Sequence, residues 1–128
     1  MLLYLIVALG SAVGGVCRYA VAELVAPRLI GHTSLPLHTL FVNVVGCYVL
    51  TLVHEAVLGG LALRPATRLL LTTGFCGGLT TYSTFNYETA RLFTERGLSR
   101  SALYAAATIG LCLLAHLLAL LTARSFSR

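Results

Sequence analysis

The stretch that decides the fold is GGLTTYSTF, residues Gly77 to Phe85, which lies inside a much longer apolar segment. Each glycine costs roughly 1 kcal/mol against alanine in a helix, and Ser and Thr hydroxyls offer the backbone alternative hydrogen bonds. The sequence therefore predicts a helix that is interrupted by unwound backbone near Gly77 to Thr81. In a membrane, such backbone persists only where it is buried in protein or faces a water-filled cavity.

The composition around this stretch is that of an integral membrane protein. Of the 128 residues, 58% are hydrophobic and only 10% are charged, whereas soluble domains carry about 25% charged residues. The net charge of +5 comes from arginines that are scattered at segment ends and form no basic stripe, so we expect no nucleic acid partner. A secretory signal requires a basic region before its apolar segment. No basic residue precedes the first apolar segment here, so we expect this segment to be retained.

Four apolar segments reach the length of about 20 residues that a membrane-spanning helix needs. They are about Leu2 to Ala26, Pro36 to Leu58, Ala66 to Phe93 and Ser101 to Ala123. The connections between them are short and carry Gly, Pro or charged residues, as turns do; the last is TERGLSR, residues 94–100. The sequence therefore predicts an all-α integral membrane fold in which residues 1–128 form a single four-helix domain and the third helix is broken.

The arginines give almost no preference for one orientation in the membrane. With four spans, both termini and the loop between spans two and three lie on one side. That side carries Arg64, Arg68, Arg124 and Arg128, and the other carries Arg28, Arg91, Arg96 and Arg100. Positive charge normally marks the cytoplasmic side, and here it is balanced. We therefore expect the chain to insert both ways up and to form an antiparallel dimer with dual topology.

Polar side chains recur every four residues on two of the expected spans, so that each row occupies one helix face. The rows are Thr39, Asn43 and Cys47 on the second span, and Tyr104, Thr108, Cys112 and His116 on the fourth. Polar groups inside a membrane are costly unless they find partners or line a pathway. Asn43 is either a hydrogen-bonding link between helices or part of such a pathway.

Aromatic and charged residues flank the expected break. Tyr82 and Phe85 are three residues apart and share a helix face. Their rings either pack in the core or present positive edges to an anion. Arg18 lies well inside the first span, where it either extends to the nearer membrane surface or faces an aqueous vestibule. Glu88 follows the break, and an interaction between Arg18 and Glu88 stays open at this point.

Each apolar segment contains one of the four cysteines, at positions 17, 47, 76 and 112. No CxxC spacing and no Cys/His cluster with the spacing of a zinc site is present in the sequence. We therefore expect free thiols that act as small hydrophobic groups in the core.

The residues around the break resemble those of a known family, the small bacterial fluoride channels (Fluc or CrcB-like). The resemblance rests on GFCGGLTTYSTFNYE at Gly74 to Glu88, GGVCRY at Gly14 to Tyr19 and FVNVVG at Phe41 to Gly46. It implies a fluoride-selective channel for passive fluoride export across the cell membrane. It also implies an antiparallel homodimer with two pores and a central structural Na⁺.

The resemblance further implies roles for single residues. The sodium ion is expected on the backbone carbonyls of Gly77 and Thr80. The fluoride pore is expected at Asn43, Tyr82, Phe85, Tyr104 and Thr108, with Arg18 and Glu88 in the vestibule. Two departures from the family pattern are visible. Tyr82 stands where the family usually has Phe, and Cys112 and His116 stand where hydroxyl residues are expected.

An enzyme is not expected, because the sequence holds no nucleophile–base pair, phosphate-binding loop or metal cluster. Two other classes remain as alternatives. A small proton-coupled multidrug exporter would need an acidic residue at mid-depth in the membrane. Glu23 and Glu88 both lie toward segment ends. A structural or holin-like membrane protein would leave the polar rows without a purpose.

Overall fold

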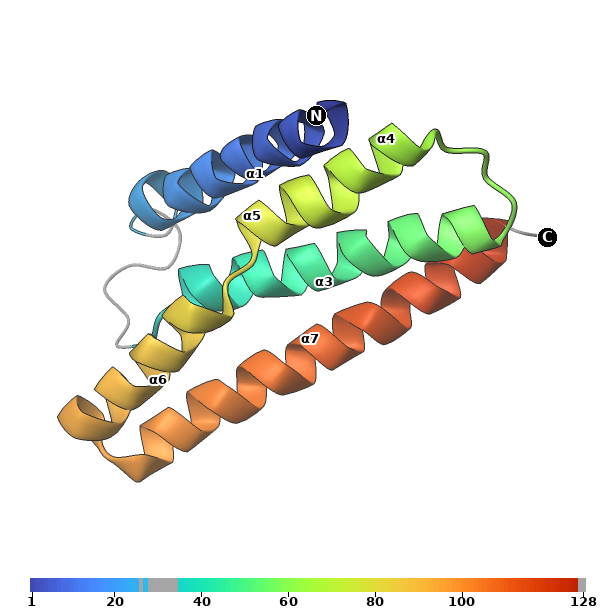
Figure 1. The fold of residues 1–128 in the computed structure, drawn as a ribbon. Helices are drawn as coiled ribbons and strands as arrows, with labels where there is room; N and C mark the ends of the chain where they lie inside the picture. Colours follow the sequence, from blue (N-terminus) through green and yellow to red (C-terminus); the bar gives the residue numbers. More distant parts are fainter. Residues whose placement is uncertain (26, 28–34, 127–128) are drawn as a thin grey trace.

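A computed structural model describes residues 1–25, 27 and 35–126, and this part of the chain is helical without any strand (Figure 1). Three helical stretches are long and apolar enough to cross a membrane: Leu2–Leu24, Leu37–Leu58 and Leu98–Ser125. Helices are the form expected here, because they satisfy every backbone polar group within one segment.

The first helix, α1, spans Leu2–Ala20 and continues as the π-helical turn η1, Val21–Val25. It lies along the chain segment that precedes the break (Figure 1). The predicted end of the first span at Ala26 and most of the following loop fall outside the described residues.

The helices α3 (Leu37–Leu58) and α7 (Leu98–Phe126) pack along each other and run in the same direction (Figure 1). The predicted second span agrees with α3 to within a residue. The prediction of a loop over residues 94–100 is wrong, because Gly97 alone lies between α6 (Tyr82–Arg96) and α7. Its φ of 85° is a conformation that glycine adopts without steric cost, so one residue reverses the chain.

The predicted break is present, and it is shorter than expected. Before it, α4 (Pro65–Leu69), the π-helical η2 (Leu70–Cys76) and α5 (Gly77–Leu79) follow one another without interruption. Thr80 and Thr81 are extended, with ψ values of 156° and 119°, and α6 begins at the next residue. The two half-helices therefore diverge at these threonines (Figure 1).

The prediction that the glycines themselves are unwound is wrong, because Gly77 and Gly78 belong to α5. The structure gives Gly78 a different role. A Cβ atom there would come within 2.8 Å of the Cα of Ser11 on α1. Gly78 is thus needed for close approach of two backbones, and the hydroxyl residues after it form the break.

Small residues bring α1 and the first half-helix into backbone contact. A Cβ atom on Gly10 would lie 2.7 Å from the carbonyl oxygen of Leu70, and one on Gly14 would lie 2.7 Å from the backbone nitrogen of Leu79. Ser11 adds a hydrogen bond of 3.3 Å from its hydroxyl to the carbonyl oxygen of Gly74. This packing fixes the first half-helix in position.

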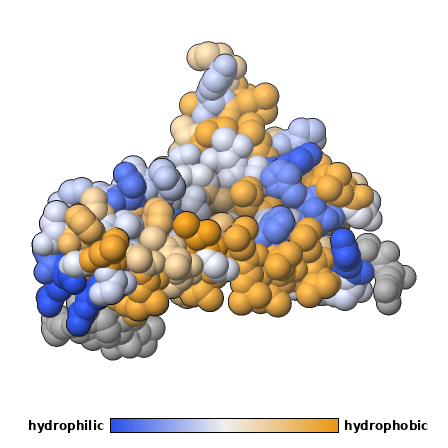
Figure 2. All heavy atoms as spheres, turned by 90° about the horizontal axis from the view of Figure 1, so that it is seen from below, coloured by the Kyte–Doolittle hydropathy of each residue, from blue (hydrophilic) through white to orange (hydrophobic). Residues whose placement is uncertain are grey.

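The molecular surface has the distribution expected of a membrane protein. Seen from below the view of Figure 1, apolar side chains cover much of the face, and many of the strongly hydrophilic ones lie toward its two ends (Figure 2). Large apolar residues are exposed along α1 and α7, among them Leu5, Leu9, Leu113 and Leu117. Such a surface is suited to lipid or to a second apolar protein surface.

Candidate functional site

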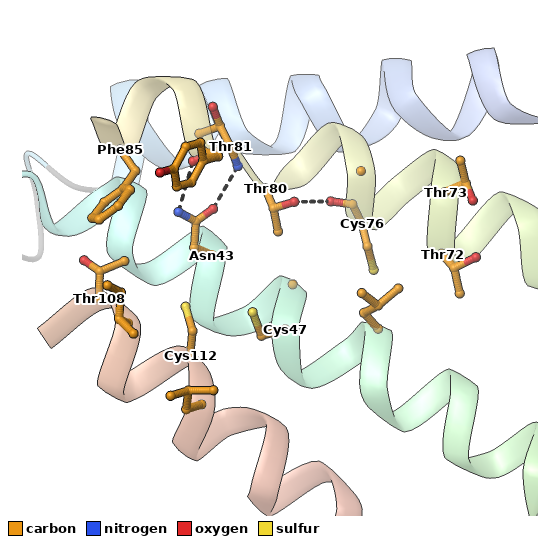
Figure 3. Close-up of a pocket in the computed structure, with 16 residues that line it drawn as sticks. Asn43, Cys47, Thr72, Thr73, Cys76, Thr80, Thr81, Phe85, Thr108 and Cys112 are labelled. Atoms are coloured by element: carbon orange, nitrogen blue, oxygen red, sulfur yellow. Dashed lines mark hydrogen bonds between the residues drawn. The ribbon is translucent and has the colours of Figure 1, made fainter. Parts of the chain in front are cut away.

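A cavity of about 610 Å³ lies where α3, η2, the break, α6 and α7 meet (Figure 3). Among the described residues, those that line it are uncharged: hydroxyl, thiol, amide, aromatic and aliphatic groups. They include six of the predicted site residues, namely Asn43, Gly77, Thr80, Tyr82, Phe85 and Thr108. The cavity surface is mostly apolar and carries a few uncharged polar groups, and this is the feature of the molecule that suits a small solute.

Asn43 joins α3 to the break by two hydrogen bonds (Figure 3). Its side-chain nitrogen donates to the carbonyl oxygen of Thr81 at 3.2 Å, and its side-chain oxygen accepts from the backbone N–H of Thr81 at 2.8 Å. The amide thus replaces the partners that an unbroken helix would provide. One N–H of the Asn43 amide remains beyond this pair, since the group has two.

The hydrogen bonds at the break leave two backbone carbonyls without their helical partners. In a continuous helix, the N–H of Thr81 would donate to the carbonyl of Gly77, but here it donates to Asn43. Likewise, the N–H of Thr84 would donate to the carbonyl of Thr80, but it donates at 3.2 Å to the hydroxyl of Thr81, which caps α6. The carbonyls of Gly77 and Thr80 are therefore without their helical partners.

Three aromatic rings follow one another from the cavity mouth to the core. The ring centres of Tyr82 and Phe85 are 5.9 Å apart, and those of Phe85 and Tyr104 are 5.6 Å apart. Tyr82 is 78% exposed, whereas Phe85 and Tyr104 are buried. Both pairs are tilted, with angles of 50° and 45° between the ring planes.

Glu88 lies behind these rings and is bound from two other helices. Its carboxylate accepts hydrogen bonds from the hydroxyls of Thr39 at 2.9 Å and Tyr104 at 2.8 Å, and the imidazole of His38 lies 3.3 Å away. The glutamate side chain is only 13% exposed. A buried carboxylate needs such donors, and this network links α3, α6 and α7.

Thr108 is the exception to this pattern of satisfied polar groups. Its side chain lines the cavity and the residue is only 4% exposed. The Thr108 hydroxyl has no hydrogen-bond partner among the residues that the structure describes. Buried hydroxyls are nearly always bonded, so this group is available to a solute in the cavity.

The predicted polar row on α7 is divided between different environments. Tyr104 binds Glu88, Thr108 and Cys112 line the cavity, and Nδ1 of His116 lies 2.8 Å from the hydroxyl of Thr51. His116 does not line the cavity. The row therefore leaves the cavity after Cys112 and ends as a link between α7 and α3.

Arg18 lies on α1, half-buried, and does not line the cavity. The interaction between Arg18 and Glu88 that the sequence left open is absent, since no ion pair joins these two described residues. The structure thus assigns Glu88 to a hydrogen-bonded network and leaves Arg18 apart from it.

Sequence reasoning missed three members of this region: His38, Thr51 and Thr81. Thr51 was detectable, because it continues the spacing of Thr39 and Cys47 on α3. Thr81 was part of the quoted motif, but its side chain acts as the helix cap rather than as part of a row. His38 gave no signal, since its contact with Glu88 joins residues far apart in the sequence.

The sequence matches a protein-family model and several curated proteins. The family model described as "CrcB-like protein, Camphor Resistance (CrcB)" matches residues 5–120. A protein of Rhizobium johnstonii is 38% identical over 127 residues, covering 99% of this chain and 100% of its own length. A protein of Rhizobium etli is 42% identical over 115 residues, with 90% of each chain covered.

A third relative, from Methanopyrus kandleri, is 49% identical over 86 residues, which are 67% of this chain and 63% of that protein. All three are named "Fluoride-specific ion channel FluC". The match of the family model covers the break, both polar helices and the small residues of α1. The chain belongs to the CrcB-like family.

Proposed function

We propose that this chain is a fluoride-selective channel through which fluoride leaves the cell passively. The observation that carries the proposal is the unpartnered hydroxyl of Thr108 in a neutral cavity. The names of the relatives, which describe fluoride-specific ion channels, support the choice of ion. The chain is accordingly a multi-pass protein of the cell membrane.

The chemistry of the cavity suits a small, strongly hydrated anion. Fluoride accepts strong hydrogen bonds, so a pathway must replace its water by donors at short distance. The Thr108 hydroxyl and the remaining N–H of Asn43 are such donors, and the edges of Tyr82 and Phe85 add weak positive charge. Because none of these groups is a fixed cation, an anion binds weakly enough to leave again.

The pathway needs a second subunit. The cavity is open at one side, and Tyr82, its most exposed aromatic lining residue, is 78% exposed. We propose that the two half-helices together form the third of four spans and that an antiparallel homodimer closes two such pathways. The balanced arginines support insertion both ways up.

We propose that Na⁺ binds at the centre of this dimer. The carbonyls of Gly77 and Thr80 fit a hard cation, because oxygen ligands suit it and both lack their helical N–H partners. Non-helical backbone that binds ions in this way occurs in transporters with broken helices. When bound, sodium supplies a fixed positive charge that holds the two broken helices together.

Glu88 and Arg18 remain candidates for the vestibule. Glu88, Tyr104 and Thr39 form a hydrogen-bonded group behind the aromatic rings. An incoming anion would begin to exchange its bound water for protein groups at this hydrogen-bonded group. Arg18 would attract anions toward the opening from α1.

Purified protein in fluoride-loaded liposomes tests the proposal, with the efflux followed by a fluoride electrode. We expect fluoride efflux well above that of fluoride-loaded vesicles without protein. Vesicles that contain the protein and are loaded with chloride should release little chloride. Fluoride efflux no faster than from protein-free liposomes would reject the channel.

A second candidate, a proton-coupled multidrug exporter, is favoured only by the carboxylate of Glu88, which lies inside the protein beside His38. The same liposomes separate the two functions. An exporter would move protons when a cationic drug is added, whereas a passive channel would show no such coupled proton flux.

A further inference from the structure

Three of the four cysteines gather at the cavity, which the core-filling role expected from the sequence does not require. Cys47 on α3, Cys76 on η2 and Cys112 on α7 all line it, and each is a free thiol. Figure 3 shows the side chains of Cys47 and Cys112 on neighbouring helices, both directed toward the cavity. The helices that carry these two thiols, α3 and α7, pack along each other.

The kind of ligand follows from the number of donors. Among the described residues, no group of three or more His, Cys, Asp or Glu side chains is arranged to hold a metal ion. A tetrahedral zinc site is thereby excluded there. Two thiolates are the donor set for a soft monovalent cation, since soft sulfur ligands select ions such as Cu⁺. His116 is not counted as a third ligand, because it does not line the cavity.

We propose that Cys47 and Cys112 bind one soft, thiophilic monovalent cation, Cu⁺ or Ag⁺, and that this ion closes the anion pathway. Binding breaks two S–H bonds, forms two sulfur–metal bonds and releases two protons to water. No electron is transferred. The product is a thiolate–metal–thiolate bridge with a net charge of −1.

The effect on transport rests on the proposed channel function. Cys112 lies one helical turn beyond Thr108 on the same face of α7, and both side chains line the cavity. A bridge with a negative charge beside the unpartnered hydroxyl of Thr108 repels an anion and also fills space. The free cation is positive, but the bridge that it forms with two thiolates is negative. Its binding therefore inhibits fluoride movement.

Binding is tested without any measurement of transport. Silver nitrate is added to the purified protein in chloride-free buffer that contains an excess of a small monothiol, and retained silver is measured after gel filtration. The monothiol removes silver that is bound to a single cysteine. It does not remove silver that is held by two protein thiols, because the second thiol acts at a high effective concentration. We expect one silver ion per chain in the wild type and in the Cys17→Ser and Cys76→Ser variants.

The Cys47→Ser and Cys112→Ser variants should each lose at least about tenfold in silver retention, because one thiol no longer supports a bridge. Their elution volumes show whether they remain folded. Retention equal to the wild type in either variant would overturn the proposal. Loss of silver in Cys17→Ser or Cys76→Ser would overturn it as well.

The transport arm compares fluoride efflux from liposomes with and without silver for each variant. We expect inhibition in the wild type and in Cys17→Ser, and none in Cys47→Ser or Cys112→Ser. Silver that binds to the pair and leaves the efflux unchanged would overturn the closing effect. Silver that binds to the pair in a protein without any fluoride efflux would reject the channel function and leave the metal site intact.

Discussion

Asn43 and Thr81 are paired in both directions: the Asn43 amide donates to the backbone carbonyl of Thr81 and accepts from its backbone N–H. This pair holds the break open, because the N–H of Thr81 no longer binds the carbonyl of Gly77. One side chain on α3 thus determines the path of the backbone between the two half-helices.

The first prediction concerns this pair. The Asn43→Asp variant keeps an acceptor for the N–H of Thr81 but cannot donate to its carbonyl, and it adds a negative charge at the cavity. We expect fluoride efflux to fall at least about tenfold, since a unit charge 4 Å from an anion repels it by about 4 kcal/mol at an effective dielectric constant of 20. Ser99→Asp, at an exposed position outside the cavity, is the control and should retain efflux.

The second prediction separates a pathway hydroxyl from a structural one. Thr108→Val keeps the shape of the side chain and removes a buried hydroxyl that has no partner among the described residues. We expect fluoride efflux to fall while the melting temperature stays the same or rises, because no hydrogen bond is lost. Thr108→Ser should retain efflux. A clear drop in the melting temperature of Thr108→Val would show that the hydroxyl is bonded within the protein.

The third prediction uses two adjacent glycines of α1. A Cβ atom on Gly14 meets the backbone of the first half-helix at Leu79, whereas one on Gly15 meets nothing within 4 Å. Gly14→Ala should therefore destabilise the protein by about 1–3 kcal/mol. Gly15→Ala should be neutral or slightly stabilising. Thermal unfolding in detergent measures both, and equal effects would contradict the close packing of α1.

The fourth prediction compares two glutamates of α6. In Glu88→Gln, one oxygen becomes an NH₂ group that faces the donors Thr39, Tyr104 or His38. A buried donor left without an acceptor costs about 1–3 kcal/mol, so the melting temperature should fall. Glu95 pairs with Arg91 on the exposed surface, and Glu95→Gln should change little. A stable Glu88→Gln variant would mean that the network can rearrange freely.

The fifth prediction concerns the proposed sodium ion. Replacing Na⁺ by a large organic cation should weaken subunit association, because the proposed ion would be the link between the carbonyls of Gly77 and Thr80 in the two subunits. The fraction of dimer, measured by crosslinking in lipid at decreasing protein concentration, should fall and recover when Na⁺ is restored. Association that does not depend on the cation would reject a structural sodium site.

Local signals in the sequence were enough to predict much of the fold. The length of the apolar segments predicted three helices close to their observed bounds. The glycines and hydroxyl residues together predicted a break over residues 77–81, of which Thr80 and Thr81 form the observed one. The spacing predicted that Thr39, Asn43 and Cys47 share one face of α3. In the structure Asn43 and Cys47 line the cavity, whereas Thr39 binds Glu88 on α6.

The position of the break within its motif was beyond local signals. Glycine lowers helix propensity wherever it occurs, so the sequence could not show that Gly78 is kept helical by contact with α1. Contacts between distant residues were also invisible, as in the pair of His116 and Thr51. Such contacts depend on how helices are rotated against each other, and only packing determines that.

The order in which the chain is made gives the break a consequence for membrane insertion. The 15 residues of α6 include four charged ones, Glu88, Arg91, Glu95 and Arg96, and each charge opposes entry of an isolated helix into lipid by about 2.5–3.5 kcal/mol at mid-depth. When α6 leaves the ribosome, α3 is already synthesised and offers Asn43 and Thr39 as partners, while Tyr104 follows on α7. Thr39, which binds the charged Glu88, would therefore already be in place when α6 reaches the membrane.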